Sequence, residues 1–385
     1  MTPVQHIRCP PAPRHTRAPP PTRRPHDAGP REQPRPRRRA APPRASAGEE
    51  GDMPESKLGP NVAAGIRDVQ QSLEWRTATV MRNDAISLDG GQRLLHLSVP
   101  DDVDKLYGRQ MQGRNATHRW IDSYTIPGQY VGLRFPGETT RAEEKSGIES
   151  ARRLYSIASS PYDSRRDSAY LGASVIEVVV DRRWGADDAR FAALAPGDTA
   201  EVSQLIGRGF CSLFSSYASL MAALEERRNL LLLAVGARGI AAARAALNWT
   251  PVLAHATQHK VTCLYVTRSP STAAFLPEWD QWREAGVDFR PLYTESLLPD
   301  SPRASPAGAA NGGADEADAG QEDVTGLLEQ GLFLNVGGLE GAVGGRPSEC
   351  TVLLAGLSGD VASAVAKELT FKGMLWERLL FCEFF

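Results

Sequence analysis

The chain has little cysteine and no long hydrophobic run, and both shortages narrow what it can be. Five cysteines are spread over 385 residues, and none forms a Cys-x-x-Cys pair. A zinc site, a disulfide framework and a cysteine-bound iron–sulfur cluster are therefore not indicated. The longest apolar runs have the length of a strand, far below the ~20 residues that span a bilayer, which leaves only peripheral contact with a membrane open. No HExxH pair and no G-x-S-x-G elbow occurs, so neither a zinc protease nor a serine hydrolase is favoured.

The first 47 residues contain no lysine and only two acids. They hold eleven arginines and thirteen prolines, for a net charge of +9, and such a composition cannot build a hydrophobic core. No apolar segment typical of a secretory signal occurs there. An arginine-rich, acid-poor start favours a disordered transit peptide over residues 1–47. A basic arm for nucleic acid or an acidic surface is the alternative.

Beyond position 47 the chain becomes acidic. It carries 33 of the 44 basic residues and 44 of the 46 acidic ones, which argues against nucleic acid as a partner. Residues 48–71 are expected to form a linker, and the rest of the chain is long enough for two domains.

Short β-rich runs separated by turn residues fill residues 72–210. The expected strands are 74–81, 93–99, 129–135, 153–159, 175–180 and 199–204. Several short strands with frequent turn signals predict a six-stranded antiparallel barrel.

The pattern changes in residues 211–385. Continuous apolar runs at 230–235, 261–266, 287–292 and 351–355 alternate with helical stretches at 238–248, 274–285 and 360–372. Such alternation predicts a doubly wound parallel sheet, the architecture of nucleotide-binding α/β domains. Residues 299–323 are rich in Pro, Ala, Gly, Ser and acids and are expected to form a disordered insert.

A cation, an aromatic ring and a hydroxyl lie together in Arg153-Leu154-Tyr155-Ser156. In a strand Arg153 and Tyr155 share one face, roughly 6 to 7 Å apart. The guanidinium is then free to grip a pyrophosphate and the ring to cover a planar heterocycle. This combination suits a flavin nucleotide, and an ordinary surface strand is the alternative.

Other short motifs surround this segment, in a fixed order along the chain: Pro127-Gly128-Gln129-Tyr130 before it, and Pro196-Gly197-Asp198 and Gly207-Arg208-Gly209-Phe210 after it. The order resembles the ferredoxin NADP reductase superfamily, in its plastid-targeted, reductase-like branch, over roughly residues 72 to 385. The resemblance implies a β + α/β fold in which an antiparallel barrel binds FAD and a doubly wound domain binds NAD(P).

The resemblance also implies roles for individual residues. Tyr155 would stack on the isoalloxazine, Ser156 would hydrogen-bond near flavin N5, and Arg153 would hold the pyrophosphate. The last residue, Phe385, stands where relatives carry an aromatic residue that covers the flavin, so Tyr155, Ser156 and Phe385 are the catalytic candidates. The other cofactor-binding candidates in the barrel are Ile157, Gly128, Gln129, Tyr130, Gly209 and Phe210. No metal ligand is expected.

Glycines mark the turn after the first parallel strand, in Gly236-Ala237-Arg238-Gly239. Such a turn lets a pyrophosphate approach the backbone, and the helix after it favours an anion at its start. Gly236 and Gly239 resemble the two glycines of the family, with one residue more between them. Gly356 would likewise leave room for the nicotinamide nucleotide. A turn that only connects strand to helix is the alternative.

Arg268, just beyond the second parallel strand, bears on the choice of nucleotide. An acid there would hold the ribose of NAD, whereas Arg suits the 2′-phosphate of NADP. NADP is therefore preferred over NAD, unless Arg268 is a solvated loop residue.

Three departures from the family weaken the case for fast catalysis. The family's Pro in the glycine turn is replaced by Ala242, and its Cys-Gly pair is replaced by Ala355-Gly356, which removes a thiol from the hydride path. Asp187 and Asp188 stand where relatives bind the pyrophosphate, and although they suit a helix cap, they repel phosphate. Arg153 and Arg182 or Arg183 would have to offset this repulsion.

The leading hypothesis is a chloroplast, rather than mitochondrial, FAD enzyme. It would take hydride from NAD(P)H onto flavin and pass electrons to an unidentified acceptor, such as a partner protein. The alternative is a catalytically weak or inactive flavoprotein-like scaffold in a plastid complex, which the altered glycine turn, the missing thiol and the acidic insert favour.

Overall fold

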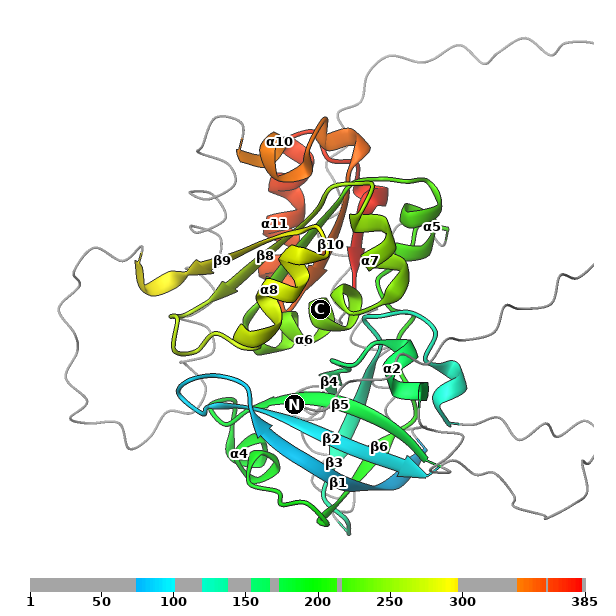
Figure 1. Ribbon diagram of the computed structural model, residues 1–385, viewed down its shortest axis with the longest axis vertical. Helices are drawn as coiled ribbons and strands as arrows, with labels where there is room; N and C mark the ends of the chain where they lie inside the picture. The colour runs from blue at the N-terminus through cyan, green and yellow to red at the C-terminus, as the bar shows by residue number, and fades with distance from the viewer. Residues whose placement is uncertain are drawn as a thin grey trace, which may run out of the picture. The chain divides into compact units, whose positions relative to one another are not determined.

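The computed structural model describes residues 74–100, 120–137, 154–166, 173–212, 217–296, 338–357 and 359–382. A six-stranded antiparallel sheet comes first, and a five-stranded parallel sheet with helices comes second (Figure 1). The fold class predicted from the sequence is therefore confirmed. The predicted transit peptide, linker and insert lie outside the described residues, and the division at residue 210 stays a prediction.

The antiparallel sheet has the strand order β4-β3-β6-β1-β2-β5. Its strands are β1 Trp75–Ala85, β2 Gln92–Pro100, β3 Tyr130–Arg134, β4 Leu154–Ser156, β5 Ala173–Asp181 and β6 Thr199–Ser203. Beyond the end of β4, Ile157 bridges Val178, and the Ala158 N–H donates to the Glu177 carbonyl at 2.7 Å. These contacts join the two outer strands, so the sheet closes into a barrel.

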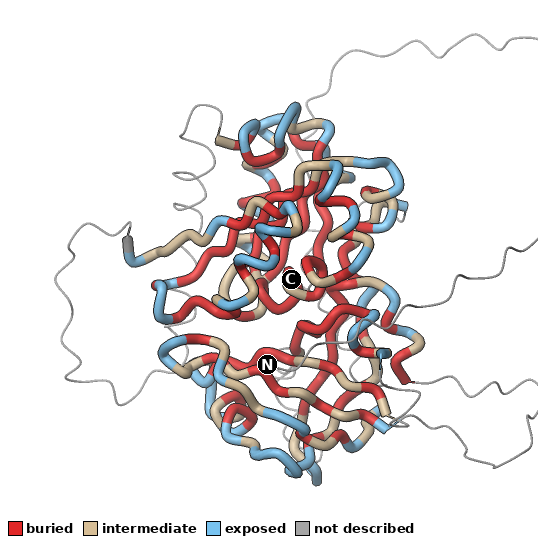
Figure 2. Tube along the Cα trace, in the orientation of Figure 1, coloured by how far each residue is buried: buried red, intermediate tan, exposed pale blue. Residues whose placement is uncertain are grey.

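Alternating burial shows why these runs form a barrel. On β2, Leu95, Leu97 and Val99 are fully buried, while the residues between them are partly exposed. The period of two sends every second side chain into the barrel core, where they meet the inward side chains of the other strands. Figure 2 shows this alternation along the barrel strands.

Short helical elements accompany the barrel strands. They are η1 Trp120–Ser123, α2 Pro161–Arg166 and α4 Ala186–Ala192. Element η1 buries Trp120 and Ile121. Helix α4 buries Phe191 in the barrel core, and this packing brings its first turn close to β4.

The parallel sheet has the strand order β11-β10-β7-β8-β9. Its strands are β7 Leu230–Val235, β8 Val261–Thr267, β9 Val287–Tyr293, β10 Thr351–Ala355 and β11 Leu379–Phe381. The four predicted strands are confirmed, and three of them, β7, β8 and β10, are almost entirely buried, as expected of central strands. Strand β11 was not predicted, because its three residues carry too little pattern.

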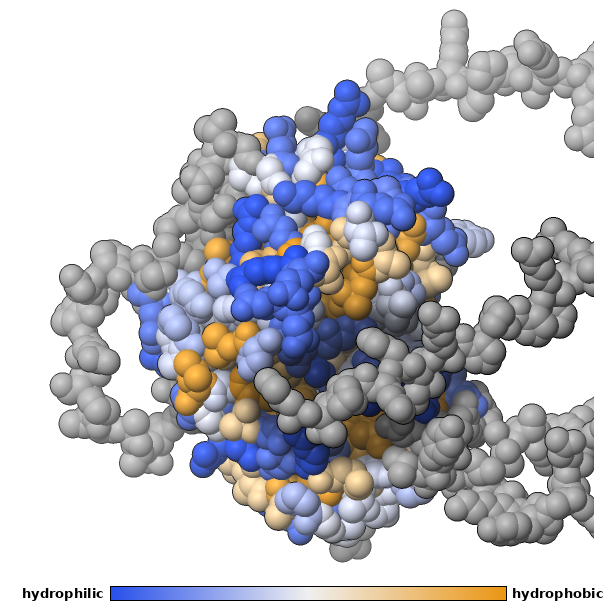
Figure 3. All heavy atoms as spheres, viewed as in Figure 1, coloured by the Kyte–Doolittle hydropathy of each residue, from blue (hydrophilic) through white to orange (hydrophobic). Residues whose placement is uncertain are grey.

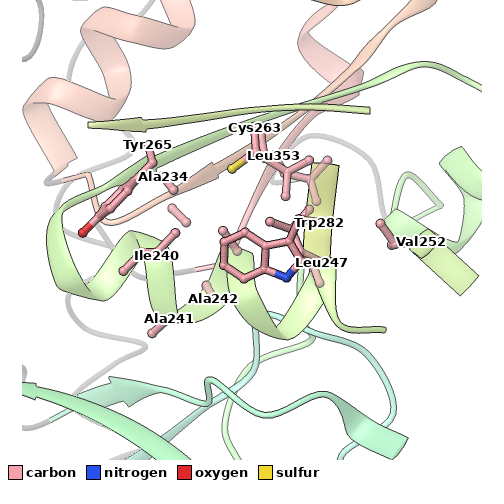
Figure 4. Close-up of a cluster of buried hydrophobic side chains, with 14 of the residues drawn as sticks. Ala234, Ile240, Ala241, Ala242, Leu247, Val252, Cys263, Tyr265, Trp282 and Leu353 are labelled. Carbon is pink, nitrogen blue, oxygen red and sulfur yellow. The ribbon is translucent and has the colours of Figure 1, made fainter. Parts of the chain in front are cut away.

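Helices cover both faces of the parallel sheet. They are α5 Leu220–Glu225, α6 Gly236–Leu247, α7 Thr250–Ala256, α8 Leu276–Glu284, α10 Gly338–Val343 and α11 Gly359–Phe371, with 3-10 turns η3 Thr294–Ser296, η5 Pro347–Glu349 and η6 Trp376–Arg378. Leu232 and Ala234 of β7 share a core with α6, α7 and α8, whereas Leu231 and Leu233 share one with α10 and α11. Figure 4 shows part of the first core, where small side chains of α6 pack beneath the strands.

An aromatic cluster packs in the core of the α/β domain. Trp279 and Trp282 on α8 lie 5.0 and 5.1 Å from the Phe289 ring on β9, measured between ring centroids. Both tryptophans are buried. They act as packing residues and are not available to a cofactor.

The surface and the cysteines add two further observations. The face in Figure 3 mixes hydrophilic and hydrophobic residues, and within the described ranges no helix has the length and apolar character needed to cross a membrane.

Cys211, Cys263, Cys350 and Cys382 are free thiols. Among the described residues no group of three or more His, Cys, Asp or Glu side chains is placed to hold a metal ion.

Candidate functional site

The predicted flavin segment forms the short strand β4. Its residues pair with β3, with Ser156 opposite Tyr130 and Tyr155 opposite Val131. The side chains of Ser156 and Ile157 are buried. Arg153 and Phe385 lie outside the described residues, so their expected contacts with the pyrophosphate and the flavin ring stay predictions.

The side chain of Tyr155 is buried inside the barrel. Only 1% of the residue is exposed, its hydroxyl donates to Asp188 Oδ1 at 2.7 Å, and its ring meets Phe191 edge to face at 6.1 Å. Helix α4 brings both Asp188 and Phe191 to the ring and covers it. The expectation that this ring stacks on a flavin stays a prediction.

Burial also controls the protonation of this pair. Loss of solvent, followed by the nearby Asp188 charge, raises the pKa of Tyr155 well above its usual value. Burial likewise raises the pKa of Asp188, although the Tyr155 hydrogen bond and the Arg238 charge oppose this shift. The phenol therefore remains a donor, and the carboxylate is held in a poorly solvated position.

The acids at the start of α4 do not cap that helix. Its N-cap residue is Gly185, and no side chain caps it. Asp187 instead pairs with Arg190 at 3.2 Å, and Asp188 accepts from Tyr155. The predicted capping role is therefore wrong.

One of the arginines expected to offset the repulsion of phosphate is already engaged. Arg183 Nη2 lies 2.6 Å from Asp181 Oδ2, and its Nη1 lies 3.3 Å from Asp89 Oδ2. These two carboxylates satisfy its charge, so Arg183 does not balance Asp187 and Asp188. A different cation, Arg238, opposes the rise in the pKa of Asp188 that burial causes.

The candidates in the Pro127–Tyr130 and Gly207–Phe210 motifs lie together, in a contact between two loops. The Gln129 amide accepts from Thr125 N–H at 3.1 Å and donates to the Gly207 carbonyl at 3.0 Å. A Cβ at Gly209 would lie 2.6 Å from the Pro127 carbonyl oxygen. These residues therefore hold the loops against each other.

The remaining candidates of these motifs take part in the same packing. A Cβ at Gly128 would lie 2.8 Å from the Cβ of Cys382 and 2.9 Å from the Phe210 ring. The rings of Tyr130 and Phe210 are buried. Their expected contact with the cofactor stays a prediction.

The glycines expected to admit the nicotinamide nucleotide have different surroundings. A Cβ at Gly239 would lie 2.5 Å from the Ala355 carbonyl oxygen, and one at Gly356 would overlap the Val235 carbonyl oxygen. The space on the Cβ side of Gly239 and Gly356 is thus filled by the chain's own backbone, and their expected role in admitting the nicotinamide nucleotide stays a prediction. They let α6 approach the ends of β7 and β10.

The surroundings of Gly236 differ from those of the other two glycines. Its φ is +60°, and nothing lies within 4 Å of a Cβ built there. It is also the first residue of α6, directly after β7. Gly236 is therefore the glycine at which a phosphate could approach the backbone.

The first turn of α6 lies beside the Tyr155–Asp188 pair. The guanidinium of Arg238 stacks over the Trp184 ring at 4.7 Å, and its charge opposes the rise in the pKa of Asp188 and Tyr155 that burial causes. Arg238 thus supplies a positive charge that favours the ionised form of Asp188.

Arg268 is paired with an acid that the sequence interpretation missed. Arg268 Nε lies 2.9 Å from Glu295 Oε1, and both side chains are largely exposed. Arg268 comes just after β8 and Glu295 just after β9, so the pair joins the carboxyl ends of neighbouring strands. The sequence places an acid just after the third parallel strand, and this was the available signal. It did not suffice, because the pairing depends on which strands are neighbours in the sheet.

Comparison with known proteins finds solved structures that are similar to the chain. No protein-family model and no curated protein matches the chain. A cytochrome P450 reductase from Amycolatopsis is similar with a TM-score of 0.48 and 20% identity, over 81% of this chain and 70% of that one. A mutant ferredoxin-NADP+ reductase from Plasmodium falciparum is similar with a TM-score of 0.48 and 12% identity, over 79% of this chain and 94% of that one.

A third similar structure is a ferredoxin NADP+ reductase from Neisseria gonorrhoeae with bound FAD and NADP. Its TM-score is 0.45 and its identity 15%, over 80% of this chain and 97% of that one. Likenesses at this level assign neither a ligand nor a site residue to this chain.

Proposed function

We propose that the chain is an FAD-dependent oxidoreductase that takes hydride from NADPH or NADH and passes electrons to an unidentified acceptor. One observation carries the proposal: the predicted flavin strand and the predicted nucleotide helix lie side by side. Arg244 of α6 donates to the Ala158 carbonyl, directly beyond β4, at 3.0 Å. Hydride transfer needs its two cofactors next to each other, and this contact supports the proposal because it holds the two segments together.

The residues fit the two cofactors unequally. Gly236, with a positive φ and open space, suits a nucleotide phosphate. The covered Tyr155 ring and the Asp188 carboxylate do not suit a flavin diphosphate as they stand. Flavin would supply the redox chemistry when bound, and its binding requires the Tyr155–Asp188 contact to open.

The chain's own residues would then orient the flavin and exclude water from it. Tyr155 stays protonated because of its burial, so its ring and hydroxyl form a neutral surface for a planar group. Ser156 adds a buried hydroxyl on the same strand. Arg238 supplies a positive charge that opposes the raised pKa of Tyr155.

The cellular setting forms part of the proposal. The arginine-rich residues 1–47 support chloroplast import, and a protein acceptor or a peripheral membrane contact would fit that setting. NADP is retained as the preferred nucleotide over NAD. The pairing of Arg268 with Glu295 weighs against that preference.

An anaerobic reduction experiment tests the proposed function. The full chain is purified, saturated with FAD and titrated separately with NADPH and NADH while flavin absorbance is followed. We expect bound flavin and loss of its oxidised absorbance with at least one nucleotide. Bound flavin that neither nucleotide reduces would show that the chain is not such an enzyme.

A scaffold role in a plastid complex is the second candidate. The buried Tyr155 ring, hydrogen-bonded to Asp188, favours it, because this contact leaves no open aromatic face for flavin. A wild-type chain that binds no FAD at saturating concentration, yet migrates with a large plastid assembly, would support this role.

A further inference from the structure

Arg244 makes the most extensive set of polar contacts described between the barrel and the α/β domain. It lies on α6, and its side chain is 11% exposed. Its Nε lies 2.9 Å from both carboxylate oxygens of Glu278 on α8. Its Nη1 donates to Glu177 on β5 and to the Ala158 carbonyl beyond β4. One guanidinium therefore joins four segments of the chain.

The two acids that contact Arg244 are themselves fixed. Glu278 Oε2 accepts from Asn248 Nδ2 at 3.1 Å, and Asn248 Oδ1 accepts from Trp282 Nε1 at 2.7 Å. The carboxylate thus has a defined position before Arg244 is considered.

Glu177 is held from the other side. Its Oε1 lies 3.2 Å from His96 Nδ1, and His96 Nε2 lies 3.2 Å from Asp84. The polar network therefore runs from β1 of the barrel, through Arg244, to α8 of the α/β domain.

Both backbone groups of Ala158 are held in this network. Its N–H donates to the Glu177 carbonyl at 2.7 Å, and its carbonyl accepts from Arg244 at 3.0 Å. Ser159 Oγ, the next residue, accepts from the Glu177 N–H at 3.1 Å. The stretch that continues β4 is therefore fixed by β5 on one side and by α6 on the other.

We propose that Arg244 is a positioning residue that fixes the β4 segment relative to helix α6. It would thereby set the distance between the groups that bind flavin and those that bind the nicotinamide nucleotide, so its catalytic consequence rests on the proposed function. Only a planar guanidinium fork can bind two carboxylates and a carbonyl in this geometry. A lysine keeps the charge but loses the fork.

The first test needs no cofactor. Hydrogen exchange is measured by mass spectrometry on the full chain, as wild type and as Arg244→Lys, with Arg290→Lys as the control. Arg290 forms a comparable bidentate pair with Asp288, but on the exposed side of β9. We expect exchange in peptides that cover residues 154–160 to accelerate about tenfold in Arg244→Lys and to be unchanged in Arg290→Lys.

Folding is checked separately, because loss of Arg244 leaves Glu177 and Glu278 without their shared cation. Arg244→Lys retains a positive charge, and its circular dichroism and thermal unfolding show whether the variant is folded. A folded Arg244→Lys chain with wild-type exchange over 154–160 would overturn the proposal. If this variant does not fold, Glu278→Gln, which keeps Arg244 and leaves Glu177 and the Ala158 carbonyl unchanged, is measured instead, with the same expected and overturning results.

The second test concerns the chemistry. In FAD-loaded protein, we expect Arg244→Lys to slow flavin reduction at saturating nucleotide about tenfold while nucleotide affinity stays unchanged. Faster exchange with an unchanged reduction rate would overturn the link to catalysis. A wild type that is not reduced at all would refute the proposed function, and the exchange measurement would still decide whether Arg244 positions the segment.

Discussion

The Tyr155 hydroxyl donates a 2.7 Å hydrogen bond to the Asp188 carboxylate. Both residues are buried, at 1% and 7% exposure, so the bond forms away from water, where a charged acceptor strengthens it. The contact joins the strand predicted to bind flavin to the helix whose acids would repel a diphosphate. Under the proposed function, flavin binding would depend on the opening of this contact.

Replacing Asp188 with Asn should tighten FAD binding about tenfold, the factor given by ~1.4 kcal/mol of removed repulsion. The amide oxygen can still accept from Tyr155, so the charge alone is lost. Titration of the full chain with FAD, followed by flavin fluorescence, measures the change.

Asp187→Asn is the matched control, because Asp187 stands one residue away but pairs with Arg190 at the surface. A smaller effect is expected there. Equal FAD affinity in wild type and Asp188→Asn would show that this carboxylate does not oppose the diphosphate.

The stability of the chain should depend on Asp188 in the acid range. Burial raises its folded-state pKa above 3.8, so the folded chain holds this proton at higher pH than the unfolded chain does. The resulting stabilisation is fully present below pH 3.8 and is lost as pH rises through the folded-state pKa. Urea unfolding of wild type and Asp188→Asn should therefore diverge as pH rises from about 4. A constant difference would contradict the raised pKa.

Gly356→Ala should destabilise the chain much more than Gly236→Ala. A Cβ at Gly356 would overlap the Val235 carbonyl oxygen and lie 2.5 Å from the Gly239 nitrogen, which predicts a loss above about 3 kcal/mol. Gly236 has open space around it, so only its positive φ resists substitution, at about 1–2 kcal/mol. Urea unfolding compares the two, and similar losses would show that α6 does not depend on this close approach.

Glu295→Gln should shift nucleotide preference toward NADPH. The substitution releases the exposed Arg268 from its ion pair, and the freed cation can meet a 2′-phosphate. Because the pair is solvated, we expect a change of about three- to fivefold in the ratio of the two nucleotide affinities. Glu295→Gln combined with Arg268→Met should abolish the shift, and a shift that survives in this double variant would assign it to another residue.

The fold could be predicted because its signals are local. The alternating pattern of β2 and the unbroken apolar run of β7 each specify a strand in a few residues. Strand β11 escaped prediction because it depends on pairing with β10 rather than on its own three residues.

The site was less predictable because it depends on contacts between distant segments. The motif around Tyr155 shows which groups share a strand, but the partners of that ring come from α4. Gly356 is close to Gly239 only because β10 lies beside β7. Arg244 carried no local signal, since its partners lie on three other segments.

Flavin fluorescence during FAD titration of wild type, Tyr155→Phe and Tyr155→Leu tests the central claim most directly, with folding checked by circular dichroism. We predict that FAD bound to wild type and to Tyr155→Phe is strongly quenched, because both retain a ring that can stack on the isoalloxazine. FAD bound to Tyr155→Leu should be brighter. Equal quenching in all three folded proteins would contradict the claim that Tyr155 leaves Asp188 to cover the flavin.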